Sequence, residues 1–227
     1  MIEELATELG DVSSEWSGKP RGDDFDDDFL ADLIESGTDP FLTLMSSLID
    51  IESAAKIRTS EKGRRTLHKL LFANVITALE TFLGDLFMKT LSSSDKYIED
   101  LVFKTPHFQE TQIRLSQIFQ RFKMIDAEVR AYIRKHNWHM LKESGMMYKR
   151  AFNIVFPEIP TTIADGIRDR HNIVHRNGKT EDGSDGLWGL AEILALKVAV
   201  LKLASEIDEL VKKLGQKKEA PSDLAEF

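Results

Sequence analysis

The sequence predicts an all-α protein, a helical bundle that follows an acidic N-terminal extension. Three observations predict this fold class. From residue 39 onward, apolar side chains recur every three or four positions, which places them on one face of a helix. Ser, Thr, Asp and Pro stand where such stretches begin, as they do at helix N-termini. The strict alternation of apolar and polar residues that marks a strand is scarce, and no internal repeat is evident.

The N-terminal extension, residues 1–38, differs in charge from the rest of the chain. Residues 1–39 hold thirteen acids and two bases, a net charge of −11, and residues 1–22 show little periodicity. We predict a partly mobile segment with one short amphipathic helix. Its apolar residues are Phe25, Phe29, Leu30 and Leu33. A solvated helix is the simpler interpretation, and a second hypothesis is that the acidic run imitates nucleic acid and covers a basic surface.

The predicted bundle spans residues 39–215 and begins with two clear helices. Asp39-Pro40 resembles an N-cap followed by proline at the first helical position. Thr59 or Ser60 starts a long helix that ends before Ser92. The two helices carry apolar residues at helical spacing: Leu44, Leu48, Ile51 and Ala55 in the first, then Leu67, Leu71, Val75, Leu79, Phe82 and Leu86.

The remaining helices follow from the same signals. Predicted starts are Thr105-Pro106 (leading to Ile113, Leu115, Ile118, Phe119 and Phe122), Asp126 and Pro160-Thr161-Thr162, and predicted ends are Gly145 and Gly215. Residues 146–158 are apolar but ambiguous. The last helix begins near Leu187 and carries a broad apolar stripe, which favours burial in a bundle core over a narrow two-stranded seam. Residues 216–227 are predicted to be a polar tail.

Composition excludes several classes of protein. The chain has no cysteine, so disulfides and thiolate zinc sites are excluded. The N-terminus lacks the basic-then-apolar layout of a secretory signal, and no uninterrupted apolar run approaches the ~20 residues that cross a bilayer. We therefore expect a cytoplasmic protein with no membrane partner.

The charge distribution is compatible with a polyanionic ligand. The net charge is −8, but residues 40–227 hold 28 bases and 25 acids, a net of +3, and residues 104–150 hold ten bases against four acids. In that basic region, five residues are candidate RNA contacts: Arg130, Arg134, Lys135, Trp138 and Lys142. A solvated basic face is the alternative.

The stretch from Arg170 to Gly178 is the likeliest place for chemistry in this sequence. It sets Arg170 and His175 five positions apart, where a predicted helix runs into an Asn-Gly turn. A guanidinium can donate hydrogen bonds to two phosphate oxygens at once, and an imidazole exchanges protons near neutral pH. RNA carries its own nucleophile, the 2′-hydroxyl, so these groups suit phosphodiester cleavage. By itself, the pair is also consistent with side chains that bond the terminal carbonyls of a helix.

This stretch resembles the R-x4-6-H signature of HEPN domains, small all-α bundles that include many prokaryotic toxin and phage-defence ribonucleases. Residues 73–83 are similar to the long early helix of that family, and residues 173–179 are similar to the local context in one of its large bacterial branches. The resemblance covers about residues 40–214.

The resemblance implies a metal-independent, cofactor-free endoribonuclease that works as a homodimer, with the two motifs facing each other across a cleft. Arg170 would contact the scissile phosphate and His175 would act as general acid or base. His171 would orient His175 or touch the substrate, and Glu80 would anchor Arg170. The supporting residues around the motif are Asn172, Arg176 and Asn177. One branch, paired with nucleotidyltransferase antitoxins, has a Tyr that receives nucleotides two residues after the motif His; Asn177 stands there, so that control is not expected.

The sequence thus predicts RNA cleavage by 2′-hydroxyl transesterification, in a toxin or abortive-infection effector with a possible antitoxin or regulatory partner. The alternative is a catalytically inactive HEPN module that binds nucleic acid, nucleotide or a protein. His171 and His175 also have the spacing of a helical two-histidine metal site, but no third ligand has a defined spacing. Trp188 and the last helix are candidates for a dimer interface or for core packing within one subunit.

Overall fold

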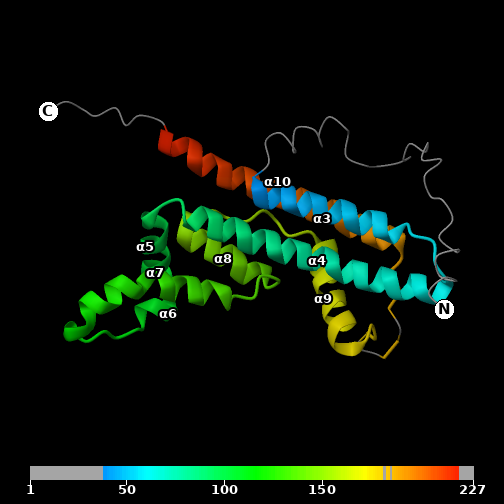
Figure 1. Cartoon of the computed structure of the whole chain (residues 1–227), viewed down its shortest axis with the longest axis horizontal. Coiled ribbons are helices and arrows are strands. Elements are labelled where there is room, and N and C mark those ends of the chain that lie inside the picture. The colour runs from blue at the N-terminus through cyan, green and yellow to red at the C-terminus, as the bar shows by residue number, and fades with distance from the viewer. Residues whose placement is uncertain (1–37, 181–182, 185, 220–227) are drawn as a thin grey trace, which may run out of the picture.

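The computed structural model describes residues 38–180, 183–184 and 186–219 and shows an all-α protein (Figure 1). Within those residues there are helices and connecting segments but no strand. The predicted short helix around Phe25, the rest of the acidic extension to residue 37, and residues 220–227 of the predicted tail lie outside the described residues. The predicted division into extension, bundle and tail stays a prediction.

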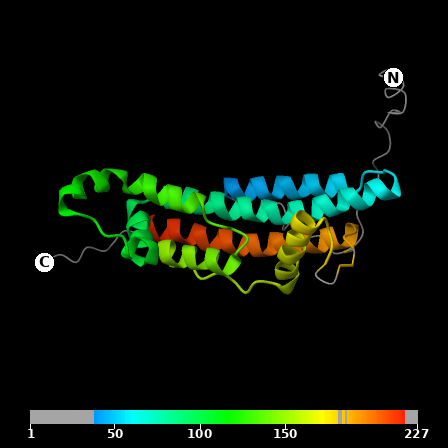
Figure 2. The ribbon, with the colours of Figure 1, turned by 90° about the horizontal axis from the view of Figure 1, so that it is seen from below.

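Three long helices form the centre of the bundle and lie side by side: α3 (Asp39–Ala55), α4 (Glu61–Leu91) and α10 (Leu190–Glu219) (Figures 1 and 2). A shorter helix, α9 (Thr161–Arg176), crosses α4 and also packs against α10. The predicted apolar stripe of α10 is confirmed over most of its length, where its members are buried: Ile193, Leu196, Val200, Leu203 and Ile207. Its last two members, Leu210 and Leu214, are half-buried. Helix α4 therefore contacts α3, α9 and α10 and carries the centre of the core.

The starts of the first two helices agree closely with the sequence. Ser60 is the N-cap of α4 and accepts a hydrogen bond from the Gly63 amide at 3.2 Å, as predicted. The N-cap of α3 is Thr38, one residue before the predicted Asp39. The Thr38 hydroxyl donates to the buried Asp208 carboxylate at 2.6 Å, so it ties the start of α3 to α10.

The second half of the bundle departs from the predicted boundaries. The helix predicted to start at Pro106 lasts one turn, α6 (Pro106–Gln109), and is followed by a 3₁₀ turn, η1 (Leu115–Gln117). The helix predicted to start at Asp126 begins eight residues earlier, as α7 (Ile118–Arg134). Asp126 lies inside this helix, where its carboxylate pairs with Arg130 at 2.8 Å one turn later.

Two glycines that were predicted to end helices lie inside them. Helix α8 (Leu141–Phe152) contains Gly145, where an added Cβ would lie 3.3 Å from the Phe156 ring, so this glycine allows close packing. Helix α10 continues through Gly215 to Glu219. The ambiguous segment from residue 146 begins as the second half of α8, and helix α5 (Asp95–Lys104), which was not predicted, packs on α8.

Apolar spacing failed as a guide to burial between residues 103 and 122. Phe119 is 84% exposed, and the apolar side chains around it are exposed to different degrees, from 46% at Ile118 upward: Phe103, Leu115, Ile118 and Phe122. They belong to the arm made by α5, α6 and α7, which projects beside the central helices (Figure 1). Apolar residues at helical spacing therefore do not mark buried core positions in this part of the chain.

Helix α4 is the one helix among the described residues that is long and apolar enough to cross a bilayer, by length and composition alone. This qualifies the sequence reading, which found no sufficiently long apolar run. In the bundle, 44% of its most apolar window is buried, and three helices pack against it. A central core helix passes the same test as a membrane span, so the finding carries little weight.

Candidate functional site

Helix α9 carries the predicted motif and is held close to the core by a glycine. A Cβ at Gly166 would lie 2.8 Å from Leu196 on α10 and 3.3 Å from Ile76 on α4, which is too close for any larger residue without movement. Ile163 and Ile173, on the same helix, are buried in the core. The sequence therefore fixes one face of α9 and leaves the other for polar side chains.

The structure brings Arg170 to Glu80, as the family resemblance implied. Arg170 Nη2 lies 3.7 Å from Glu80 Oε2, an ion-pair distance that is too long for a direct hydrogen bond. The Arg170 and Glu80 side chains are 23% and 19% exposed, so water screens the pair only in part. The carboxylate of α4 thus holds the guanidinium of α9 at the edge of the core.

His139 is a third member of this cluster. Its Nδ1 lies 3.0 Å from Glu80 Oε1, an oxygen that is buried and accepts no well-angled hydrogen bond. The His139 side chain is 25% exposed and comes from the loop between α7 and α8. Glu80 therefore stands between a cation and an imidazole, and it can orient both.

A pocket of about 530 Å³ joins this cluster to the histidines of α9. Its polar lining includes Arg170, His171, His175, His139 and Asn137. The rings of His171 and His175 lie 4.6 Å apart at an angle of 44°. Both histidines are exposed, and His175 makes no hydrogen bond or ion pair with any described residue. Arg168 also lines this pocket but pairs with Asp165. One pocket therefore offers two guanidiniums and three imidazoles to a ligand.

Neither Arg170 nor His175 bonds a terminal carbonyl of α9 within the described residues. The Gly178 amide donates to the Asn172 carbonyl at 2.9 Å, and Lys69 Nζ donates to the Asn177 carbonyl and side-chain oxygen, each at 3.2 Å. Asn177 adopts a left-handed conformation with φ 54°, as is usual at a helix end. This geometry removes the interpretation of the Arg–His pair as a helix cap.

The other supporting residues have distinct surroundings. Asn172 is buried and acts through the carbonyl that closes the helix end, whereas Arg176 and Asn177 are exposed. Within the described residues, no group of three or more His, Asp or Glu side chains has the arrangement of a metal site. His171 and His175 thus have no third protein ligand in that part of the chain.

The predicted RNA-contact residues differ in burial and in whether they are already paired. Trp138 packs into an aromatic cluster, 5.3 Å from the Phe87 ring and 4.7 Å from the His136 ring, so most of its ring is committed to the core. Arg130 is tied to Asp126 and to the Ser92 hydroxyl. Arg134, Lys135 and Lys142 are exposed and make no ion pair with described residues, so they are the members of this set that an RNA strand can reach.

Sequence reasoning missed the place of His139 in the site. His139 follows His136 by three positions, but thirty residues lie between His139 and Arg170 and no spacing rule links these two. The structure also separates the two histidines. His136 bonds the Ser144 hydroxyl at 3.0 Å, and burial lowers its pKa, whereas His139 faces Glu80.

In comparisons with protein-family models, curated proteins and solved structures, none matches this chain. The helices themselves show the fold class. What the site can do therefore has to be argued from its own residues and distances.

Proposed function

We propose that this protein is a metal-independent endoribonuclease of the HEPN type. The observation that carries the proposal is one pocket that holds Arg170, fixed by Glu80, together with the free imidazole of His175. Metal-free cleavage of RNA needs a base, an acid and a cation for the phosphate, and these two residues supply the cation and one of the two proton carriers. No cofactor or metal enters the proposed reaction.

The proposed reaction is transesterification by the 2′-hydroxyl. A base removes the proton of this hydroxyl, whose oxygen attacks the adjacent phosphorus. The bond from phosphorus to the 5′-oxygen breaks, and an acid gives a proton to that oxygen. The products are a 2′,3′-cyclic phosphate and a 5′-hydroxyl, so atoms and charges balance. Each placed acid or base contributes roughly 10²–10⁴-fold to the rate.

The residues divide the work by their surroundings. Arg170 contacts the scissile phosphate and neutralises the charge that grows on its oxygens, and Glu80 keeps the guanidinium in place. His175 transfers the proton, since nothing in the described chain engages its ring nitrogens. His171 lies against the His175 ring and positions it. His139, oriented by Glu80 in the same pocket, is the second proton carrier within reach.

We further propose that the working enzyme is a homodimer in which two such pockets share one cleft. The exposure of His171 and His175 supports this, because a water-filled pocket becomes a catalytic site only when substrate or a second subunit covers it. In this proposal the protein acts in the cytoplasm as a toxin or an abortive-infection effector, under the control of an antitoxin or another regulatory protein.

The test is cleavage of a mixed RNA substrate by the purified chain and by His175→Ala and Arg170→Ala. We expect both variants to lose at least about 100-fold in rate, with unchanged helical circular dichroism. His107→Ala and Arg58→Ala are matched controls, because they delete an exposed histidine and an exposed arginine that do not line the pocket.

Two outcomes would overturn the assignment. Undiminished cleavage by both variants would mean that the reaction happens elsewhere on the chain. RNA binding without cleavage by the wild-type protein, abolished in both variants, would instead identify an inactive binding module built on the same pocket. Growth of bacteria that express wild type or His175→Ala separates the same alternatives inside cells.

A further inference from the structure

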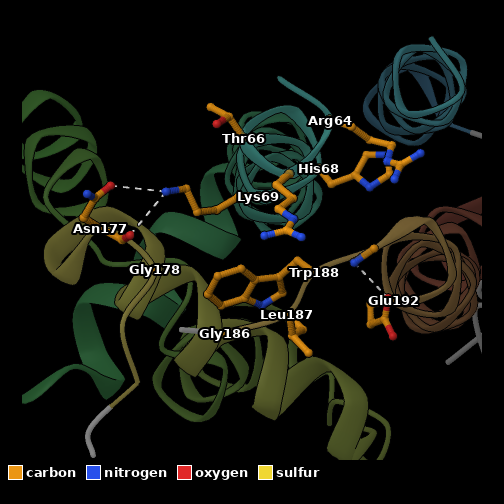
Figure 3. Close-up of a pocket in the computed structure, with 12 residues that line it drawn as sticks. Arg64, Thr66, His68, Lys69, Asn177, Gly178, Gly186, Leu187, Trp188 and Glu192 are labelled. Atoms are coloured by element: carbon orange, nitrogen blue, oxygen red, sulfur yellow. Dashed lines mark hydrogen bonds between the residues drawn. The ribbon is translucent and has the colours of Figure 1, made fainter. Parts of the chain in front are cut away.

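A second pocket, of about 420 Å³, lies where α4 begins, beside the turn that follows α9 (Figure 3). None of its lining residues belongs to the predicted RNA contacts; the sequence marked Asn177 as a supporting residue of the motif and Trp188 as a candidate for a dimer interface or for core packing. Its lining includes Arg64, Arg65, Lys69, Asn177, Gly178 and Trp188. The pocket thus combines three cations with one indole ring.

The cations of this pocket keep donors available for an anion. Arg64 makes no ion pair or side-chain hydrogen bond with any described residue, and Arg65 pairs only with the exposed Glu61 on its own helix. Lys69 gives two hydrogen bonds to Asn177 and retains a third donor. Glu192, the one acid among the lining residues, already accepts a hydrogen bond from the Gly189 amide at 2.8 Å. The pocket is therefore net positive.

Trp188 is held in place by its neighbours but is not fully buried. Its ring lies 6.2 Å from the Phe72 ring, and the Gly186 amide donates to the Gly178 carbonyl at 3.0 Å beside it. A Cβ at Gly178 would come within 3.1 Å of the indole, and one at Gly186 within 2.3 Å, so the backbone packs directly on the ring. Figure 3 shows the indole beneath the Lys69 side chain, at the base of the pocket.

The two pockets lie on either side of the C-terminal end of α9. His175 lines the first, and Asn177 lines the second. On α4, Glu80 contacts Arg170 at the first pocket and Lys69 contacts Asn177 at the second. Eleven residues of helix separate Glu80 from Lys69, a rise of about 16 Å. A stacked single strand covers that distance with about five nucleotides, and an extended strand with fewer.

We propose that this second pocket binds a nucleotide of the RNA strand a few positions from the cleaved bond, with the base stacked on Trp188 and the phosphate held by Arg64 and Arg65. A guanidinium pair recognises a phosphate by paired hydrogen bonds, and an indole stacks on any base. This inference rests on the proposed ribonuclease function and adds a subsite to it. It makes the enzyme favour RNA long enough to reach both pockets.

The experiment measures binding of 2′-O-methyl oligonucleotides, which lack the attacking hydroxyl, to the full-length chain by fluorescence anisotropy. For wild type, we expect affinity to rise by tenfold or more as the oligonucleotide grows from two to six nucleotides. The double variant Arg64→Ala/Arg65→Ala and the single variant Trp188→Leu should lose that rise. The salt dependence of the double variant should also fall by about 0.7 in logarithmic slope, because one phosphate is no longer neutralised.

Lys62→Ala is the matched control, since Lys62 is an exposed cation on the same turn of α4 that does not line this pocket. It should bind the hexanucleotide as wild type does. Equal affinity of wild type and the double variant for the hexanucleotide would overturn the proposal. So would wild-type binding of a free mononucleotide as tight as that of the hexanucleotide, because the pocket would then hold a separate ligand.

The proposed ribonuclease function fails in a different assay. If His175→Ala cleaves RNA as wild type does, the reaction is misassigned, whatever the oligonucleotides show. If cleavage depends on His175 but affinity has no length dependence, only the subsite is refuted.

Discussion

Arg170 and His175 lie five residues apart on one helix, yet their surroundings are opposite. Arg170 is three-quarters buried and paired with Glu80, whereas His175 is exposed, lies against the ring of His171 and makes no hydrogen bond or ion pair with the described residues. The difference teaches which group is preorganised and which is free to act. A cation that stabilises charge has to be fixed before the reaction, while a proton carrier has to reach more than one partner.

The largest expected effect comes from changing the shape of the fixed cation. Arg170→Lys keeps the charge but loses the planar fork that can hold a phosphate by two hydrogen bonds. We expect RNA cleavage to fall by about 100-fold, comparable to the loss of one donor to a transition-state oxyanion. Steady-state kinetics with Arg58→Lys as control checks this. Cleavage within twofold of wild type would show that Arg170 acts as a point charge alone.

The next effect comes from removing the charge that holds Arg170. Glu80→Gln leaves the shape of the side chain but takes away the partner of both Arg170 and His139. We expect about a tenfold lower rate, because the guanidinium of Arg170 loses the charge that holds it in place. In a double-mutant cycle with Arg170→Ala, the two losses should not add. Additive losses would mean that Glu80 does not work through Arg170.

The exposed end of α9 can be tested for structural order. Gly178 has φ +86°, and an added Cβ would meet Lys69 at 2.9 Å and Trp188 at 3.1 Å. Gly178→Ala should lower the free energy of unfolding by about 1–2 kcal/mol. Gly215→Ala is the control, since it lies in a helix with no atom within 4 Å of the added Cβ, and it should not destabilise. Equal melting temperatures for both variants would show that the turn after His175 is not fixed.

The smallest effect contrasts a half-buried histidine with the exposed one. Burial lowers the pKa of His136, which bonds Ser144 and packs on Trp138, while Glu143 opposes the shift. The unfolded chain then binds a proton more readily than the folded one. The contribution of His136 to the free energy of unfolding is therefore complete above pH ~6.5 and is lost as the pH falls below that value. His136→Gln should flatten the fall in melting temperature between pH 7 and pH 5. An unchanged profile would contradict this.

Much of the fold and part of the site could be read from the sequence. Ser60, Pro160 and the α10 stripe marked helices because caps and apolar spacing are local signals. The predicted boundaries at Asp126, Gly145 and Gly215 were wrong, because all three residues lie inside helices. Asp126 pairs with Arg130, and Gly145 packs on the Phe156 ring, whereas an added Cβ at Gly215 would meet no atom within 4 Å. His139 lines the first pocket and Trp188 lines the second. Tertiary packing brings both residues there, and no spacing in the sequence indicates it.

The most direct test of the central claim is the chemistry of the cut ends. Mass spectrometry of RNA incubated with the purified chain should show 2′,3′-cyclic phosphates and 5′-hydroxyls, and His175→Ala should yield neither above background. Products with 3′-hydroxyl and 5′-phosphate ends, or cyclic phosphates formed equally by His175→Ala, would contradict the account.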